Sequence, residues 1–473
     1  MVFRDVTLQA PPGIDVEIDF TVARDAALFT LLDGLTGQGE ILRLGEASFD
    51  LEYRSSFETH SGELQQIFTL GPNTVILGGR YQRGDFDTRV RLTDRDNNQF
   101  PEEHILFRDP PAKQDFNVDF ERTSLYLYDV WRVTPWLSLT GGVSWDRVEY
   151  PENFRSPPVN GRQSSLDKVS PKVGLVLQPW RGATVRGAYA EAISGASFDE
   201  SIRLEPSQVA GFLQSYRTLA SESLAGSVAG SEYRFSGLSV EQKLPSRTYL
   251  GVELSIVEQD LEQTTGVLDL LTAGGIALGV LPSSLSERSS YREEAITATI
   301  NQLVGDRWAF GARYRYVHSK FDRESRALTA AAQRTMDLSA IDDLARTART
   351  HVESGLHSLS LSALYNHPSG FFARAEANWY LQENDDLITG ASASVPDETG
   401  RSTRTFKSRN EGLPGEDFWQ FNVLAGYRFQ RNQWEVSCGL LNLTGADYLL
   451  NPLSPYNELV RDRTLVVRCR FQF

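Results

Sequence analysis

The residues with the clearest chemical potential are arginines that alternate with apolar side chains. In RWAFGARYRYVH, Arg313 and Arg315 fall on every second position, opposite a face of tryptophan, phenylalanine and tyrosine. The full set is Arg186, Arg313, Arg315, Arg374, Arg428, Arg468 and Arg470. Rings of charged side chains select ions in pores, so arginines that line one lumen would form a basic pathway for an anionic solute or polymer.

A second interpretation gives the same arginines a purely structural role. Glu253, Glu376 and Glu435 stand on the same polar faces and could pair with them. A wide lumen has to be polar whether or not it binds a solute, so this interpretation needs no special function. It is the favoured one, and the basic pathway remains the alternative.

Acidic stretches form another candidate site, at 94–104, 382–386 and 394–400. Carboxylate oxygens are the ligands that divalent cations prefer. Such loops are more often solvated, or contact lipopolysaccharide through bridging cations. We therefore predict no specific metal site and no cofactor.

Catalytic motifs are lacking in the sequence. The six histidines include no HxxxH or HExxH pair, and His60, expected in a short outer loop after Glu58, is weak support for a catalytic group. No phosphate-binding GxxxxGK[ST] motif occurs. Cys438 and Cys469 are expected on neighbouring strands, both facing lipid as small hydrophobic residues. The prediction is a protein that is not an enzyme.

The elements that position these residues are strands with a period of two. In FFARAEANWYLQ (371–382), alanines and Trp379 share one face while Arg374 and Glu376 share the other. FNVLAGYRFQ (421–430) and the final RTLVVRCRFQF (463–473) alternate in the same way. One face is apolar and aromatic, and the other is polar and often carries arginine.

The connections between the strands alternate strictly in length, which separates a barrel from a soluble sandwich. The short turns are Gly71–Asn73, Thr134–Trp136, Pro179–Gly182, Pro245–Arg247, Val304–Asp306, His367–Gly370 and Gln430–Asn432. The long loops are expected at 90–116, 151–167, 196–230, 263–289, 325–351, 385–415 and 444–459. Short periplasmic turns and long extracellular loops are typical of bacterial outer-membrane barrels.

The predicted fold is therefore all-β, a transmembrane antiparallel β-barrel of about 16 strands. Residues 44–57 and 61–70 are expected to be separate strands, and the last strand is expected to close against the first. Residues 43–473 would form the barrel, and residues 1–42 an N-terminal periplasmic or lumen segment. Within this segment 14–22 could be an extra strand and 23–35 a short helix; a helix is also expected in the loop 325–351.

Composition agrees with this class. The chain has 473 residues, 40% of them hydrophobic and 11% aromatic, with a mean hydropathy of −0.33. No apolar stretch approaches the length of a transmembrane helix, yet a barrel strand needs only alternate positions to be apolar. The net charge of −15 argues against nucleic acid as a partner. The start, MVFRDVTLQAPPG, has no signal-peptide core, so an exported form would be mature or part of a longer precursor.

Four motifs carry a family resemblance, and their order and spacing are more specific than any one of them. They are SLYLYDVWRVTPWLSLTGGVSWD (124–146), VSPKVGLVLQPWRGATVRGAYAEAI (169–193), LEPSQVAGF (204–212) and GLLNLTGADYLLNP (439–452). Together they resemble the C-terminal barrel of TonB-dependent outer-membrane receptors. The resemblance implies a bacterial outer-membrane location and the binding or passage of a solute.

The sequence also departs from that family. Typical receptors place a plug domain of over a hundred residues before a barrel of twenty-two strands. Here about 42 residues precede the expected barrel, without a recognisable plug or TonB box. The likeness extends to related barrels that follow tetratricopeptide repeats and resemble exporters.

These observations leave two functions open. The first is a receptor or transporter that binds or passes a solute; the second is a structural or export barrel that anchors a periplasmic partner or repeat domain. The expected partners are outer-membrane lipid, lipopolysaccharide, the barrel-assembly machinery and a periplasmic domain or energy-coupling protein. The terminal Phe473 resembles the C-terminal signal that such barrels present for assembly, although it could simply sit at the membrane interface.

Overall fold

The fold was analysed in a computed structural model of the chain. The structure describes residues 2–9, 14–23, 44–94, 112–194, 203–214, 229–273, 276–326, 349–384, 388–389, 392–393, 404–405, 408–409, 415–429, 434–448, 450 and 462–471. In these residues no helix is long and apolar enough to cross a membrane. The helices expected at 23–35 and in 325–351, and Phe473, lie outside the described residues.

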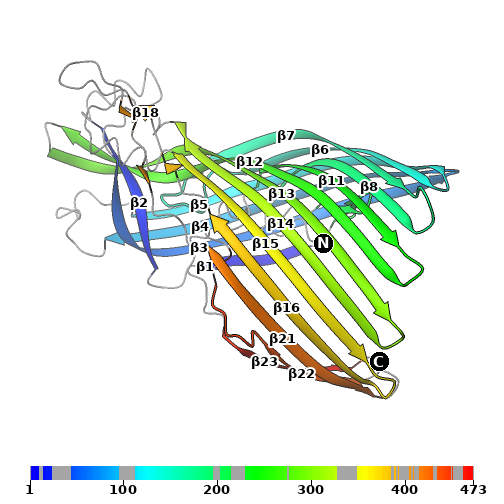
Figure 1. Ribbon diagram of the computed structural model, residues 1–473. Helices are drawn as coiled ribbons and strands as arrows, with labels where there is room; N and C mark the ends of the chain where they lie inside the picture. Colours follow the sequence, from blue (N-terminus) through cyan, green and yellow to red (C-terminus); the bar gives the residue numbers. More distant parts are fainter. Residues whose placement is uncertain are drawn as a thin grey trace.

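Almost all described residues belong to one large antiparallel sheet (Figure 1). Its strands are β1 (Val2–Gln9), β2 (Ile14–Ala23), β3 (Leu44–Leu70), β4 (Asn73–Asp94), β5 (Lys113–Thr134), β6 (Leu137–Pro151), β7 (Gln163–Leu177), β8 (Ala183–Ile193), β11 (Glu232–Lys243), β12 (Thr248–Ala273), β13 (Ile276–Val304), β14 (Trp308–Ser325), β15 (Arg349–Asn366), β16 (Phe371–Asn384), β21 (Glu416–Phe429), β22 (Trp434–Leu441) and β23 (Thr464–Phe471). Six further strands of two residues each pair among themselves: β9 (Gln208–Val209), β10 (Phe212–Leu213), β17 (Ile388–Thr389), β18 (Ser392–Ala393), β19 (Arg404–Thr405) and β20 (Ser408–Arg409).

From β3 to β23 each strand of the large sheet pairs antiparallel with the next one in the chain. The short turns gather at one end of the sheet, the right and lower right of Figure 1, and the long connections leave from the other end. This up-and-down order with alternating connection lengths confirms the predicted fold class.

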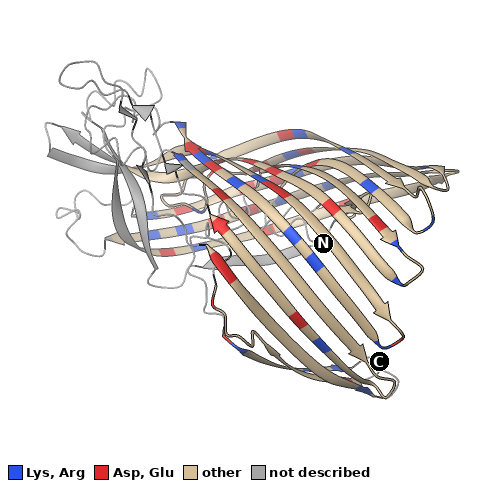
Figure 2. Ribbon diagram, in the orientation of Figure 1, with Lys and Arg blue, Asp and Glu red and all other residues tan. Residues whose placement is uncertain are grey.

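Alternation along each strand gives the sheet two different faces. On β21 the odd-numbered residues, such as Trp419, are exposed, and the even-numbered ones, such as Asn422, are half-buried. On β5 the even-numbered Tyr126 and Tyr128 are buried, whereas Leu125 and Leu127 are about half exposed. The face that exposes leucine, valine and tryptophan faces lipid, and the other face lines the lumen. Figure 2 shows charged positions on most strands, some in short runs, with uncharged stretches between them.

Aromatic rings form bands on the lipid face. Near the short turns Trp308 lies 4.6 Å from Tyr365, and Trp434 lies 4.4 Å from Phe471, between ring centroids. Nearer the long loops Trp379 and Trp419 lie 6.5 Å apart. About ten residues separate the two bands on β21, or about 33 Å along the strand. A tilt of about 40° reduces this to about 25 Å, which is the height of the apolar band in such barrels.

The two strands expected at 44–57 and 61–70 are a single strand, β3. His60 and Gly62 lie inside it, paired with Arg83 and Tyr81 of β4, so the expected short outer loop at His60 does not exist. The reason is the length of β4, which pairs with β3 from Phe49 to Leu70 and satisfies the backbone groups of an uninterrupted strand.

The segment before residue 42 contributes strands to the same sheet. β1 pairs with β3 between Arg54 and His60, and β2 continues along β3 between Leu44 and Leu51, both antiparallel. The extra strand expected at 14–22 is therefore present, and it pairs with β3 in the large sheet. The alternation in IDVEIDFTV favours pairing with the open edge of β3. The domain boundary after residue 42 stays a prediction.

The sheet contains seventeen strands, but β1 and β2 lie end to end beside β3 and occupy one position. The number of positions agrees with the predicted number of about 16 strands, although the individual strands differ from those predicted. The expected antiparallel closure of the last strand on strand 44–57 is wrong. Both β3 and β23 start at the long-loop end and run in the same direction (Figure 1). Among the described residues β23 pairs with β22 alone. β1 and β2 run the opposite way to β3.

The expected long loop 263–289 is another correction. β12 and β13 pair continuously up to Ala273 and Ile276, so this region is an extension of their hairpin. Its tip reaches β2, which pairs in parallel with residues 268–271 of β12. Serine, threonine and glycine made this stretch look like a loop, but a ladder between two strands satisfies its backbone groups equally well.

Candidate lumen site

Four of the seven predicted arginines form ion pairs with carboxylates in the structure. Arg186 Nη1 lies 2.6 Å from Glu241 Oε1, Arg315 Nη2 lies 2.8 Å from Glu293, and Arg428 Nε lies 2.8 Å from Glu435. Arg374 pairs with Glu376 on its own strand. The register places all of them on the lumen face.

The remaining three arginines differ from these. Arg313, Arg468 and Arg470 are exposed on the lumen face and form no ion pair with any described residue. Arg313 lies on β14, while Arg468 and Arg470 lie on β23, five strands further along the sheet. The sequence therefore located the arginines on their faces but gave no means of telling the paired from the unpaired ones. Whether they form a solute pathway stays a prediction.

Residues 203–214 fold back onto the lumen wall as a small hairpin, formed by β9 and β10. Its tip is Ala210–Gly211, where both residues have positive φ angles of 50° and 92°. A left-handed conformation is costly for most residues and suits glycine, which explains Gly211 in the turn. The inner hairpin, as we name residues 203–214, lies in the predicted loop 196–230 and contains the motif LEPSQVAGF.

Polar contacts fix the inner hairpin to β3 and β5. The Glu63 carboxylate accepts hydrogen bonds from the backbone N–H groups of Leu204, at 2.9 Å, and Glu205, at 3.2 Å. The Tyr128 hydroxyl donates to Glu205 Oε1 at 2.5 Å, and Gln214 Nε2 donates to the Tyr128 hydroxyl at 3.2 Å. These contacts join residues far apart in the sequence, so the hairpin has a defined place on the wall.

Apolar packing completes this attachment. Val209 is buried against Tyr126 and Tyr128, and Phe212 is buried against Ala190 and Phe235. A Cβ atom at Gly174 of β7 would lie 2.8 Å from Val209 Cγ1 and 2.9 Å from Ala210 Cβ. Glycine is therefore the residue that allows the hairpin tip to lie this close to β7.

A buried cation lies beneath the inner hairpin. The Lys172 side chain is 1% exposed, and its Nζ donates to Ser144 Oγ at 2.7 Å and lies 3.8 Å from Glu205 Oε1. Nearby on the same wall, Arg122 pairs with Asp146 at 2.8 Å, and both are almost fully buried. A charge removed from water needs a partner, so the hairpin carboxylate Glu205 helps to hold Lys172 in place.

A polar pocket of about 1,040 Å³ opens in the lumen at the short-turn end. Its walls come from the turn at 178–182 and from β8, β11, β12, β13 and β14. The lining side chains include Trp180, Ser239, Glu241, Lys243, Tyr249, Glu253, Thr297, Thr299, Asn301 and Arg313. We call this the mouth pocket. Two predicted residues belong to it, Arg313 and the carboxylate Glu253, and the Arg186–Glu241 pair joins it to the tip of the inner hairpin, because Gly211 lies against Arg186.

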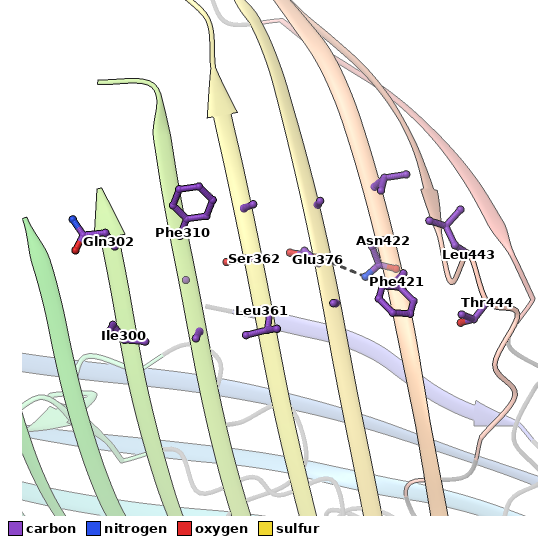
Figure 3. Close-up of a pocket in the computed structure, with 16 residues that line it drawn as sticks. Ile300, Gln302, Phe310, Leu361, Ser362, Glu376, Phe421, Asn422, Leu443 and Thr444 are labelled. Atoms are coloured by element: carbon purple, nitrogen blue, oxygen red, sulfur yellow. Dashed lines mark hydrogen bonds between the residues drawn. The ribbon is translucent and has the colours of Figure 1, made fainter. Parts of the chain in front are cut away.

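A second hollow, of about 790 Å³, lies on the opposite face (Figure 3). Phe310, Leu361, Phe421 and Leu443 surround it, and alanines of β14, β15 and β16 form its floor. The hydrogen bond from Asn422 to Glu376, drawn in Figure 3, belongs to the lumen face of the same strands. An apolar groove on the lipid face suits an acyl chain and offers nothing to a polar solute.

Other predicted candidates take no part in a described site. His60 lies on β3 with its Nε2 3.9 Å from Glu58, and Cys438 and Cys469 are free and exposed on the lipid face, as expected. Among the described residues no group of three or more metal-ligating side chains is placed to hold an ion. Most of the acidic stretches 94–104 and 394–400 lies outside the described residues.

Comparisons with known proteins agree with this picture. The family model "TonB dependent receptor-like, beta-barrel" matches residues 16–223. A curated relative, the probable TonB-dependent siderophore receptor PiuA of Acinetobacter baumannii, is 30% identical over 86 residues, or 18% of this chain and 12% of the relative. The chain thus matches only a small part of that relative's length.

Solved structures similar to this chain include a siderophore receptor and an iron transporter. The siderophore receptor PiuA from Acinetobacter baumannii has a TM-score of 0.48 at 14% identity, covering 93% of this chain and 58% of that one. The FrpB iron transporter from Neisseria meningitidis has a TM-score of 0.48 at 12% identity, covering 90% and 60%. The chain spans somewhat more than half the length of each. Because neither TM-score reaches 0.5, these two structures carry no argument for the fold. The fold class is assigned from the strand pattern and the family model.

The fold and the family match define the class of protein, an antiparallel transmembrane β-barrel of the bacterial outer membrane. The model of TonB-dependent receptor-like barrels matches residues 16–223, which agrees with the resemblance indicated by three of the motifs. The fourth motif, 439–452, lies beyond the matched residues.

Proposed function

We propose that this barrel binds a solute and passes it across the outer membrane, in the manner of a TonB-dependent receptor barrel. The observation that carries the proposal is the charged and hydroxyl-rich lumen wall, which the mouth pocket and the arginine–glutamate pairs form inside a barrel that matches this family. A barrel that only anchors a partner would not need a water-accessible pocket in its lumen. Ion pairs alone are compatible with both functions.

We further propose that the inner hairpin narrows the lumen of this barrel. It is attached to one side of the wall, by β3, β5, β7 and β8, and leaves the mouth pocket open beneath it. Energy for directed transport would come from a periplasmic energy-coupling partner. The name of the curated relative describes a siderophore receptor. That name does not identify the solute of this chain.

The test is liposome swelling. The purified, folded chain is inserted into liposomes loaded with a polymer, and the swelling rate is followed in isotonic solutions of uncharged sugars of increasing size. We expect swelling that slows as the sugars become larger, because a partly narrowed lumen admits small solutes first. Liposomes that stay sealed to the smallest sugar, with the chain shown to be inserted, would refute passage and favour an anchoring barrel.

A further inference from the structure

The mouth pocket has three chemical features that converge on one kind of ligand. It is lined by hydroxyl and amide side chains, it contains more cations than carboxylates, and two aromatic rings stand at its edge. We propose that the mouth pocket is a binding site for an anionic carbohydrate, an oligosaccharide with carboxylate or phosphate groups. This inference rests on the proposed function and specifies its substrate class.

Hydroxyl and charged side chains of the pocket lie side by side on neighbouring strands. Antiparallel register places Ser239 of β11 opposite Glu253 of β12, Glu253 opposite Thr297 of β13, and Thr299 opposite Arg313 of β14. These side chains therefore face the lumen at nearly one level. Groups that both donate and accept hydrogen bonds match the hydroxyls of a sugar.

The charge of the pocket favours an anion. Arg181, Lys243 and Arg313 line it together with the carboxylates Glu241 and Glu253. Glu241 is neutralised by Arg186 at 2.6 Å, so cations outnumber anions at the site. Arg313 forms no ion pair with a described residue, and its guanidinium is the group best able to receive a carboxylate or phosphate in a bidentate contact.

The aromatic rings supply the apolar part of sugar recognition. Trp180 is 63% exposed, and its indole Nε1 donates to Gln242 Oε1 at 2.7 Å, which fixes the ring. Tyr249 lies under Lys243, whose Nζ is 5.5 Å from the ring centroid. The apolar faces of such rings stack on the C–H groups of sugars, while water or protein forms the hydrogen bond with the N–H or O–H group at the ring edge.

The size of the pocket also fits this ligand. Its volume of about 1,040 Å³ is at the upper end of the range for pockets that hold small molecules. A single sugar would leave most of it filled with water, so an oligosaccharide of several units is the better match. A lumen site open at one end would also allow a longer chain to pass through.

The experiment measures binding of trigalacturonate to the folded full chain in detergent micelles, by tryptophan fluorescence and calorimetry. Uncharged maltotriose is the comparison ligand. We expect saturable binding of trigalacturonate. Maltotriose should bind at least about tenfold more weakly, because maltotriose lacks the anionic groups that Arg313 recognises. Replacing Trp180 by phenylalanine should remove the fluorescence change while calorimetry still detects binding.

Two arginine variants decide whether the pocket is the site. R313Q should weaken trigalacturonate binding at least about tenfold, or about 1.4 kcal/mol, because it removes the hydrogen bonds from a charged donor. R468Q removes the same charge from another unpaired lumen arginine outside the pocket and should leave affinity within about twofold. Equal losses in both variants, or no saturable binding to the wild type, would overturn the proposal.

The outcome is separable from the proposed function. If uncharged sugars swell the liposomes but trigalacturonate does not bind, the proposal that solutes pass through the barrel is supported and the anionic-carbohydrate site is refuted. Binding that depends on Arg313 in a barrel that stays sealed would keep the site and refute passage.

Discussion

At the residue scale, Gly174 decides whether the inner hairpin can lie on the lumen wall. In G174V the new side chain would occupy the space of Val209 and Ala210, so the hairpin tip should leave the wall. The measurement is labelling of a cysteine at position 210 by a membrane-impermeant maleimide, with Cys438 and Cys469 replaced by serine. We expect the maleimide to label this cysteine at least about fivefold faster in G174V than in the protein that keeps Gly174.

Gly141, on the lipid face of the neighbouring strand β6, is the matched control for Gly174. A Cβ at Gly141 would meet no atom within 4 Å. G141V should therefore leave labelling unchanged. Labelling of the G174V variant at the wild-type rate would contradict the close approach of hairpin and wall.

Tyr128 makes a second residue-scale prediction, about stability. Y128F removes the hydroxyl that donates to Glu205 and accepts from Gln214, and leaves these buried groups without that partner. We expect the free energy of unfolding in micelles to fall by about 1–3 kcal/mol, measured by urea titration. Tyr81, about half exposed on the lipid face, provides the control Y81F, which should change it by less than about 0.5 kcal/mol.

The sequence predicted the residues of the site only in part. Arginines at alternate positions show which face they occupy, because side-chain direction follows from a period of two. The partner of each arginine depends on the strand register, which alternation alone does not specify. The inner hairpin was missed for a related reason. Its anchors Glu63, Tyr128 and Lys172 lie on three strands, far from Glu205 in the sequence.

At the scale of the element, strand alternation makes a prediction that separates the two faces. Leu254 of β12 is exposed toward lipid, and the next residue, Ser255, faces the lumen. L254R should lower the free energy of unfolding by about 2–4 kcal/mol, because a charge on the lipid face near the membrane centre is costly.

S255R adds the same charge one residue away and should change that free energy by less than about 1 kcal/mol, since the lumen face contacts water. Both variants are measured by unfolding in lipid vesicles. A larger loss for S255R than for L254R would show that the assignment of the two faces is inverted.

The elements themselves were largely predictable. Every predicted short turn lies between two strands that the structure pairs, and in six of the seven glycine or proline interrupts the alternation. The errors concern 58–62 and 263–289, where polar residues and glycine in a strand were taken for a loop. Such stretches continue as strands when a long neighbour supplies a hydrogen-bonding ladder, and that neighbour cannot be identified from local composition.

At the scale of the whole molecule, an apolar and aromatic outer face and a charged inner face define an outer-membrane barrel whose lumen contains the candidate site. The inner hairpin occupies one side of the lumen wall, and the mouth pocket lies at the short-turn end, which is the periplasmic end in this class. A solute path through the barrel would therefore pass the hairpin before it reaches the pocket.

The most direct test of this account is the single-channel current of the purified, folded chain in a planar lipid bilayer. We predict discrete conductance steps, with a larger step size for G174V than for G141V, because removal of the inner hairpin from the wall changes the width of the path. A bilayer that stays sealed with both variants and the wild type, although the protein is inserted, would contradict the claim that the lumen is a solute pathway.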